Sequence, residues 1–217
     1  MKISGGIFDM DGTLIDSMFV YEEVAHSYLE KIGLKNEPEL EKFFLTRTAL
    51  ELAHIISGEY KINKPVQEIV EEINAFFFDF YANLIQKKEG ISEFLKMLKS
   101  KNVKLALLTA SDREIAFQCL KRNGLLDFFD EFVFCSEHKT SKREPEIFFF
   151  TQELLGTKSE ETFVFEDALY AVKTAKKAGF KTCGIYDEWC HSDIEKMAET
   201  CEIYGRNWKE IKDLFSK

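Results

Sequence analysis

The chain has 217 residues, of which 45% are hydrophobic, and its formal net charge at pH 7 is −9. This length allows one well-packed core domain together with a smaller partner domain. The basic residues are scattered among acidic ones and form no stripe, which argues against binding to nucleic acid or to an anionic membrane surface.

Cysteine usage and the N-terminus bear on the cellular compartment. The five cysteines are widely spaced and contain no Cys-x-x-Cys pair, which disfavours a structural zinc site and a disulfide framework. The N-terminus lacks the long apolar region of a signal peptide, and no segment reaches membrane-spanning length. We expect a cytoplasmic protein with no membrane or nucleic-acid partner, present as a monomer or weak dimer.

Two carboxylates follow a predicted buried strand at residues 3–8. Asp9 and Asp11 stand at its carboxyl end, before a turn at Gly12. In open α/β sheets, reacting groups lie at this end of the strands. A solvated turn is the plain alternative. Half of a calcium loop is excluded, because residues 13–15 (Thr-Leu-Ile) do not supply the alternating oxygen ligands that such a loop requires.

A run of helices follows the first strand and its turn. The apolar spacing predicts helices at residues 17–32, 37–45, 46–56 and 65–84. Four consecutive helices without a strand interrupt an α/β pattern, and the simplest account is an inserted helical bundle. We therefore expect a cap domain at residues 17–86 and a catalytic core formed by residues 1–16 and 87–217.

From residue 88 onward, helices and strands alternate. Strands are predicted at residues 103–109, 131–135, 162–165 and 181–186. The helices between them include one from residue 111 to 122, where Ser111 and Glu114 have the spacing of a capping box. Two short helices end the chain. This alternation predicts a three-layer, Rossmann-like α/β fold with a parallel sheet and right-handed crossovers.

Polar side chains gather at the carboxyl ends of these strands, which parallel pairing brings to one edge of the sheet. They are Asp9, Asp11, Thr109, Lys142, Glu166 and Asp167. Crowded carboxylates repel one another unless a cation joins them, and an oxygen-only set favours a hard ion, for which Mg²⁺ fits best. A hydroxyl and an ammonium beside that ion would hold the oxygens of a phosphoryl group.

Four stretches together carry a family resemblance. They are Asp9-x-Asp11-Gly12-Thr13-Leu14-x-Asp16, Leu107-Leu108-Thr109, Lys142-x-x-Pro145-Glu146-Ile147-Phe148, and Phe165-Glu166-Asp167 followed by Ala175-x-x-Ala178-Gly179. In this order and spacing they resemble the motifs of the haloacid dehalogenase-like hydrolase superfamily, and within it the β-phosphoglucomutase-like phosphatases with a helical cap. The resemblance implies a sheet order of 5-4-1-2-3, with the strand of Asp9 in the centre.

The resemblance also implies a role for each motif residue. Asp9 would be the nucleophile that forms an aspartyl-phosphate, and Asp11 the general acid and then base. Thr109 and Lys142 would hold the phosphoryl group. The ligands of Mg²⁺ would be Asp9, Asp11 through its backbone carbonyl, Glu166 and Asp167. Ala110 and Ser111 would bind the substrate beside Thr109, and Arg47 is a candidate cap contact to a second anionic group.

Each of these roles has a structural alternative. Lys142, taken alone, is a typical surface lysine, Thr109 a strand terminus, Ser111 a helix cap and Arg47 a surface arginine. The third motif usually reads Lys-Pro-x-Pro, and Arg143 replaces the first proline here. A less rigid loop would hold Lys142 less firmly.

The predicted function is a Mg²⁺-dependent phosphatase that hydrolyses the phosphate monoester of a small phosphorylated metabolite. A sugar-phosphate mutase resembling β-phosphoglucomutase is the first alternative, although Tyr21 stands where mutases carry a histidine. A catalytically inactive binding protein on the same fold is the second. Asp11 argues against carbon–halogen cleavage, because a second aspartate at this position acts in phosphoryl chemistry.

Overall fold

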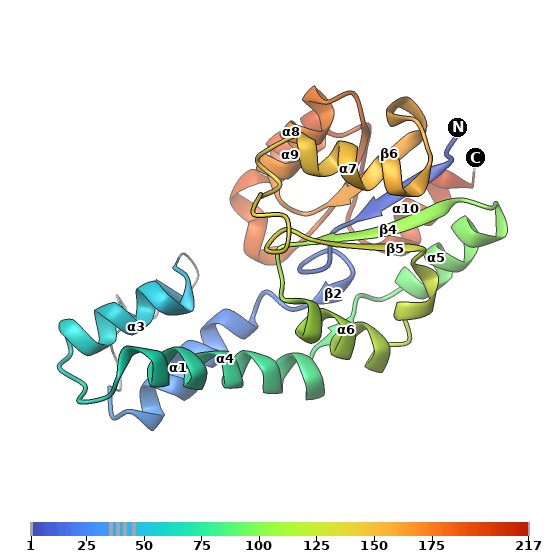
Figure 1. Cartoon of the computed structure of the whole chain (residues 1–217). Coiled ribbons are helices and arrows are strands. Elements are labelled where there is room, and N and C mark those ends of the chain that lie inside the picture. The colour runs from blue at the N-terminus through green and yellow to red at the C-terminus, as the bar shows by residue number, and fades with distance from the viewer. Residues whose placement is uncertain (1, 35–36, 38–39, 41–42, 45–46, 217) are drawn as a thin grey trace. The chain divides into compact units, whose positions relative to one another are not determined.

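The computed structural model describes residues 2–34, 37, 40, 43, 44 and 47–216 and divides into two compact units (Figure 1). The first unit contains the chain up to Asp16 and from Gln86 onward, and the second unit is Ser17–Ile85. The expected cap, residues 17–86, ends one residue later than this second unit. The first unit holds all the strands among the described residues, and the second holds only helices.

A parallel sheet forms the centre of the first unit. Its strands in the described chain are β1 (Gly5–Phe8), β4 (Lys104–Thr109), β5 (Glu131–Phe134), β6 (Thr162–Glu166), β7 (Lys181–Ile185) and β8 (Ile203–Gly205). Across the sheet their order is β5-β4-β1-β6-β7-β8, with β1 between β4 and β6. The sequence predicted the first five and missed β8, because three residues at a sheet edge carry no readable alternation.

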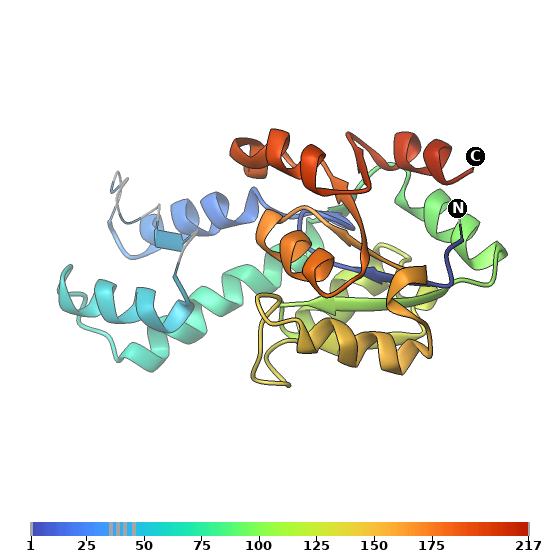
Figure 2. The same cartoon turned by 90° about the horizontal axis from the view of Figure 1, so that it is seen from above.

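Helices cover both faces of this sheet. They are α5 (Ile91–Ser100), α6 (Arg113–Arg122), α7 (Glu146–Leu155), α8 (Leu169–Lys177), α9 (Ile194–Thr200) and α10 (Trp208–Phe215), with the short 3₁₀ helices η1 (Leu126–Phe128), η2 (Ser159–Glu161) and η3 (Glu188–Asp193). Figure 1 shows α7 and α8 on one side of the strands and α5 and α6 on the other. Seen from above, α7 and α10 also lie on opposite sides of the sheet (Figure 2).

The two faces of β1 differ in the side chains they bury. Ile7 joins Ala106, Val164 and residues of α7 and α8 in an aliphatic core. On the other face, Phe8 stacks on Phe165 with ring centroids 4.1 Å apart. Alternate residues of a strand point to opposite faces, so each face of the central strand is packed by a different layer of helices.

An aromatic cluster fills the second face. Phe94 of α5 lies 4.9 Å from Trp208 of α10 and 5.4 Å from Phe165, measured between ring centroids. Gly6 makes room for this cluster, because a Cβ there would lie 2.9 Å from the Phe8 ring and 3.3 Å from the Phe165 ring. The glycine that interrupts the apolar run of the first strand is therefore a packing requirement.

The chain crosses between the units through a two-stranded ribbon that the sequence did not predict. In it, β2 (Ile15–Asp16) pairs antiparallel with β3 (Gln86–Lys87), with Ile15 opposite Lys87 and Asp16 opposite Gln86. The Lys88 N–H then donates to the Leu14 carbonyl over 2.9 Å. Two residues a strand are too few for a pattern of alternation to show in the sequence.

The second unit contains α1 (Val20–Lys31), α3 (Ala49–Gly58) and α4 (Val66–Asn83). Thr48 and Glu51 form a capping box at the start of α3. Most of the helix predicted at residues 37–45 lies outside the described residues. No described helix has both the length and the apolar character needed to span a membrane.

Glu72 of α4 connects this helix to α1 and to the segment that precedes α4. Its carboxylate accepts hydrogen bonds from the Nζ atoms of Lys31 (2.9 Å) and Lys64 (2.7 Å) and from the Tyr28 hydroxyl (3.1 Å). The hydrogen bond from Lys64, opposed by partial burial and reinforced by those from Lys31 and Tyr28, lowers the pKa of Glu72 to about 2. The Tyr28 ring also packs edge-on against Phe76.

Replacing Phe165 by alanine tests the aromatic cluster. Phe165→Ala removes a ring that is fully buried, and we expect the free energy of unfolding to fall by about 3–5 kcal/mol, because a cavity adds to the lost burial. Phe150→Ala is the matched control, since Phe150 is 37% exposed, and it should cost no more than about 1 kcal/mol. Urea denaturation followed by circular dichroism measures both. Equal losses would contradict the proposed role of the cluster.

Candidate active site

Three strands bring the predicted motif residues to one edge of the sheet. Phe8 of β1 pairs with Leu107 of β4 and with Phe165 of β6. The Asp9 N–H donates to the Phe165 carbonyl over 3.0 Å, so Asp9 continues the strand pairing by one residue. Because the strands are parallel and in register here, the groups that follow β1 and end β4 and β6 share this edge.

Lys142 connects two of the carboxylates. It lies in the loop after β5, and only 4% of its side chain is exposed. Its Nζ donates to Oδ1 of Asp9 and to Oε1 of Glu166, the latter over 2.7 Å. The other oxygen of Glu166 accepts from the Ala168 N–H over 2.9 Å. Lys142 is therefore a buried charge with two anionic partners, which excludes its alternative as a surface lysine.

Arg143 takes the place of the proline that the motif usually carries. Its guanidinium lies over the Tyr170 ring, 4.3 Å from the ring centroid. The backbone N–H of Arg143 donates to the Ser141 hydroxyl over 3.3 Å. A cation–π contact of this kind restrains a side chain. The loop thus gains side-chain restraints next to Lys142 where a proline would restrict the backbone.

Asp9, Glu166 and Asp167 form a buried acidic cluster. One oxygen of each lies within 4.8 Å of the others. With all three ionised and Lys142 charged, the cluster has an excess of two negative charges, which a divalent cation would balance. The donors are all carboxylate oxygens, so the set fits a hard cation better than zinc or copper. These three residues are those that could hold a metal ion.

Burial, together with the neighbouring carboxylates, raises the pKa values of two carboxyl groups in this cluster. Burial raises the pKa of Asp9 to about 7, against the lowering effect of Lys142 and with the help of Glu166 and Asp11. Burial and the charges of Glu166 and Asp9 likewise raise the pKa of Asp167 well above its usual value. Burial disfavours the charged form of Lys142, yet Asp9 and Glu166 hold the pKa of Lys142 above its usual value.

The turn after Asp11 fits closely against Asp167. Gly12 has a φ of +74°, and a Cβ on it would lie 2.4 Å from Oδ2 of Asp167. Thr13 donates from Oγ1 to Oδ1 of Asp167 over 3.2 Å, and its carbonyl accepts from Nε1 of Trp208 over 3.0 Å. Thr13 was part of the quoted motif, but no role was assigned to it. The structure shows that it orients Asp167.

Ser111 contacts the second aspartate. Its Oγ donates to Oδ2 of Asp11, and its N–H donates to Oγ1 of Thr109 over 3.0 Å. The predicted capping box at Ser111 is wrong, because Asp112 is the N-cap of α6 and accepts from the Glu114 N–H over 3.0 Å. With the cap supplied by Asp112, the Ser111 hydroxyl faces the candidate site. Ala110, between Thr109 and Ser111, is exposed.

One acidic residue near the cluster was not predicted from the sequence. Asp187, just after β7, is buried and pairs with Lys88 over 2.8 Å. It also accepts from the Trp189 N–H over 2.9 Å, and its charge contributes to the raised pKa of Asp167 after burial and nearer charges. Its position directly after the fifth predicted strand could have identified Asp187 as a candidate, because the other acidic residues of the cluster also stand at strand ends.

Arg47 belongs to the second unit. Its guanidinium lies 3.8 Å from Oε1 of Glu51, which is four residues further along the chain, and 5.8 Å from the centroid of the Phe43 ring. About half of its side chain is exposed. These contacts anchor Arg47 at the start of α3, and its role toward a substrate stays a prediction.

Comparison with known proteins identifies the family of this chain. The model of the haloacid dehalogenase-like hydrolase family matches residues 6–185. The chain belongs to this family. The match includes both aspartates after β1, Thr109, Lys142 and the Glu166–Asp167 pair.

Relatives with assigned names include two kinds of phosphatase. A phosphorylated carbohydrates phosphatase of Thermotoga maritima is 30% identical over 175 residues, covering 81% of each chain. The pyrophosphatase PpaX of Halalkalibacterium halodurans is 30% identical over 189 residues, covering 84% of this chain and 83% of its own. Both alignments span the larger part of each protein.

Solved structures share this fold. A Thermotoga maritima protein, provisionally described as a β-phosphoglucomutase, aligns with a TM-score of 0.83 and 26% identity over 99% of both chains. CbbY from Rhodobacter sphaeroides, solved in complex with phosphate, aligns with a TM-score of 0.75 over 96% of both chains. At 19% identity, this similarity shows a common fold and nothing further.

Gly12→Ala tests the fit between the turn and the acidic cluster. An alanine there has both a positive φ and a clash with Asp167, so we expect the free energy of unfolding to fall by more than the ~1 kcal/mol of backbone strain alone. Gly156→Ala is the control, because Gly156 has a φ of +65° and nothing lies within 4 Å of its Cβ position. The rise in unfolding temperature on adding MgCl₂ should be smaller in Gly12→Ala than in the wild type, and unchanged in Gly156→Ala.

The raised carboxyl pKa values predict how stability depends on pH. The folded Asp9 carboxyl titrates near pH 7 and the unfolded one near 3.8, so the folded state binds more protons between these values. Stability of the protein in EDTA should therefore fall as pH rises from about 4 to about 7. Asp9→Asn should make this dependence of stability on pH less steep, and the raised pKa of Asp167 should account for the part that remains. Urea titrations at several pH values measure it, and an unchanged slope would contradict the assignment.

Proposed function

We propose that the chain is a Mg²⁺-dependent phosphatase that hydrolyses a phosphate monoester of a phosphorylated carbohydrate through an aspartyl-phosphate on Asp9. The observation that carries this proposal is the placement of Asp9. One carboxylate oxygen accepts a hydrogen bond from Lys142, while the same residue belongs to a cluster with Glu166 and Asp167 that could hold a metal ion. Family membership and the named phosphatase relative support the same chemistry.

Asp9 would act as the nucleophile. Its oxygen attacks phosphorus, the bond to the leaving alcohol breaks, and water later cleaves the acyl phosphate, so that one difficult displacement is divided into two. Lys142, held by Glu166, keeps Asp9 in one rotamer and adds positive charge beside the transferring group. Thr109 and the neighbouring residues Ala110 and Ser111 would bind the phosphoryl oxygens.

Asp11 would transfer the protons. It gives a proton to the leaving alcohol and takes one from the attacking water. The hydrogen bond from Ser111 Oγ fixes one of its carboxylate oxygens. Asp11 is also more exposed than Asp9, which suits a group that exchanges protons with the leaving group and with water. Ser111 would therefore act as a positioning residue for the acid and base.

Mg²⁺, when bound, would neutralise charge on the phosphoryl group. Asp9, Glu166 and Asp167 would be its carboxylate ligands, with the Asp11 carbonyl. Both oxygens of Glu166 already accept hydrogen bonds, from Lys142 and from the Ala168 N–H. Thr13 holds Asp167 by its hydroxyl. The donor set of the described cluster is compatible with this ion because it contains only oxygen.

The helical unit would select the substrate. Residues 17–86 are proposed as the cap, which would exclude water from the reaction and contact the leaving group. Ser17–Ile85 form a compact unit of their own, as such a cap requires. Arg47 would offer a positive charge to a second anionic group of the substrate.

Replacement of the nucleophile tests the proposal. Asp9→Asn should lower the rate of phosphate release from sugar phosphates by roughly 10³-fold or more, because the displacement loses its attacking group. Asp213→Asn is the control, since Asp213 is an exposed aspartate on α10, and it should keep the wild-type rate. A panel of sugar phosphates, with Mg²⁺ or with EDTA, measures both. Unchanged turnover in Asp9→Asn would contradict the proposal.

Three alternatives make different predictions once pyrophosphate is added to this panel. The named PpaX relatives favour pyrophosphate as a competing substrate, and the structural neighbour favours a sugar-phosphate mutase. Faster hydrolysis of pyrophosphate than of every sugar phosphate would support the first. A sugar-phosphate isomer formed without free phosphate would support the second. A protein that turns over none of these compounds would match the inactive binding protein.

A further inference from the structure

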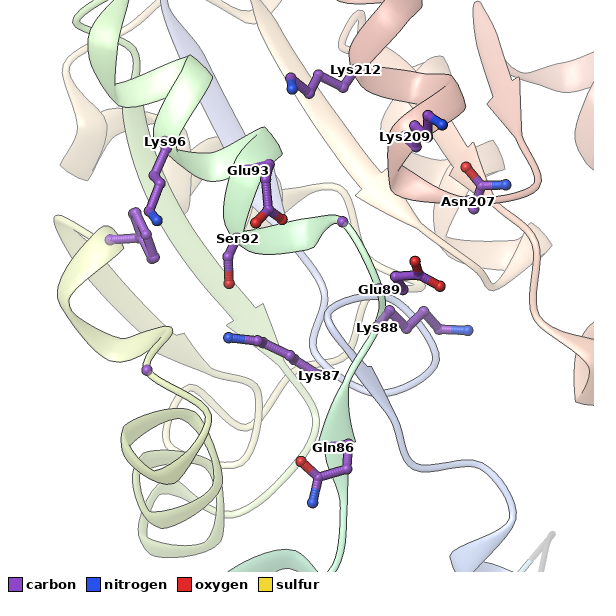
Figure 3. A pocket seen from close by; sticks show the side chains of 13 residues that line it. Gln86, Lys87, Lys88, Glu89, Ser92, Glu93, Lys96, Asn207, Lys209 and Lys212 are labelled. Atoms are coloured by element: carbon purple, nitrogen blue, oxygen red, sulfur yellow. The ribbon is translucent and has the colours of Figure 1, made fainter.

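A cavity of about 970 Å³ lies in the first unit, where α5 and α10 begin. Its lining contains five lysines and two glutamates, in a chain with a net charge of −9. Figure 3 shows Lys87 and Lys88 on the segment that leads into α5, Lys96 on α5 and Lys209 and Lys212 on α10. None of the described residues in this lining belongs to the Asp9 site, so the cavity is a separate place on the core.

The positive charge of this cavity is compensated only in part, because five lysines stand beside two glutamates in the lining and one of the lysines, Lys88, has a partner outside it. Lys88 pairs with Asp187, which does not line the cavity. Lys87 donates from Nζ to the Asn123 carbonyl over 3.1 Å, which places its ammonium without neutralising it. Within the part of the chain that the structure describes, Lys96, Lys209 and Lys212 have no ion-pair partner. Lysines that face one cavity without carboxylate partners attract an anion.

The first turn of α5 adds hydrogen-bond donors to the cavity. Gly90 is its N-cap and supplies no side chain, so no side-chain cap occupies the first N–H groups of this helix. The Ser92 hydroxyl is buried and has no hydrogen-bond partner among the described residues. Figure 3 shows the Ser92 side chain pointing toward the side on which Lys87 lies. A buried hydroxyl without a protein partner is free to donate to an acceptor from outside the chain, such as a water molecule or a phosphate oxygen.

We propose that this cavity binds a small polyanion carrying phosphate groups, at a site distinct from that of the substrate. Lys87 and Lys96 would pair with phosphate oxygens, and Ser92 would donate after a rotation about its χ1 torsion. Lys209 and Lys212 would contact a further phosphate. The ring of Phe128, which also lines the cavity, would pack against an organic part of the ligand. The two sources of this chemistry are an inorganic oligophosphate and a nucleotide.

Calorimetric titration with tripolyphosphate and with ATP tests the proposal. With EDTA present, the full-length protein should bind at least one probe saturably, and binding should weaken with added NaCl. Lys96→Gln and Ser92→Ala should each raise the Kd about tenfold. Lys177→Gln, which removes an exposed lysine of α8 outside the cavity, should leave the Kd within about twofold. Tighter binding of ATP than of tripolyphosphate would identify a nucleotide, and equal binding an inorganic chain.

Stability measurements separate binding from folding. Because the Ser92 hydroxyl has no described partner, Ser92→Ala should unfold at the same temperature as the wild type or higher. Lys96→Gln should keep the wild-type rate on a sugar phosphate without added polyanion. Lys142→Gln, a substitution at the Asp9 site, should leave the Kd of the probes unchanged. The proposal is overturned if neither probe binds, or if Lys142→Gln abolishes binding that Lys96→Gln does not affect.

Discussion

The ion pairs of Lys142 are the interaction on which the rest of the site depends. Burying Asp9 and Glu166 beside each other is unfavourable, and one ammonium between them offsets part of that repulsion. The acidic cluster still keeps an excess of negative charge, which is the property that makes it a candidate for a divalent cation. The same arrangement holds the proposed nucleophile in a defined position. One buried lysine thus makes it possible for several carboxylates to share the edge of this sheet.

Thr13 and Trp208 connect this electrostatic centre to the packed core. The Thr13 hydroxyl holds Asp167, while the Thr13 carbonyl accepts from the indole of Trp208. That indole belongs to the aromatic cluster beneath β1 and β6. A hydrogen bond from the aromatic cluster therefore holds the turn that follows Asp11. Glycine at position 12 allows the turn to approach Asp167 so closely.

The sequence predicted the family, confirmed by comparison, because its four motifs follow one another in a recognisable order and spacing. It predicted the α/β class because the alternation of helices and strands shows in local patterns of apolar residues. It also named the carboxylates and the lysine that the structure brings together. The capping box expected at Ser111 was wrong, because the next residue, Asp112, caps the helix. The hydrogen bond from Ser111 to Asp11 was not predicted, because these residues lie a hundred positions apart in the chain. The ribbon of β2 and β3 and the edge strand β8 were too short to show periodicity.

The ribbon has a consequence for how the helical unit came to be placed in the chain. Asp16 and Gln86 are register partners, so the first and last residues flanking that unit are already neighbours in the core. An insertion whose ends meet in this way behaves like an enlarged hairpin loop, and lengthening such a loop adds little closure entropy. A helical unit of different size at this place would therefore add little closure entropy, and the pairing of β1, the strand that precedes Asp9, would not depend on its length.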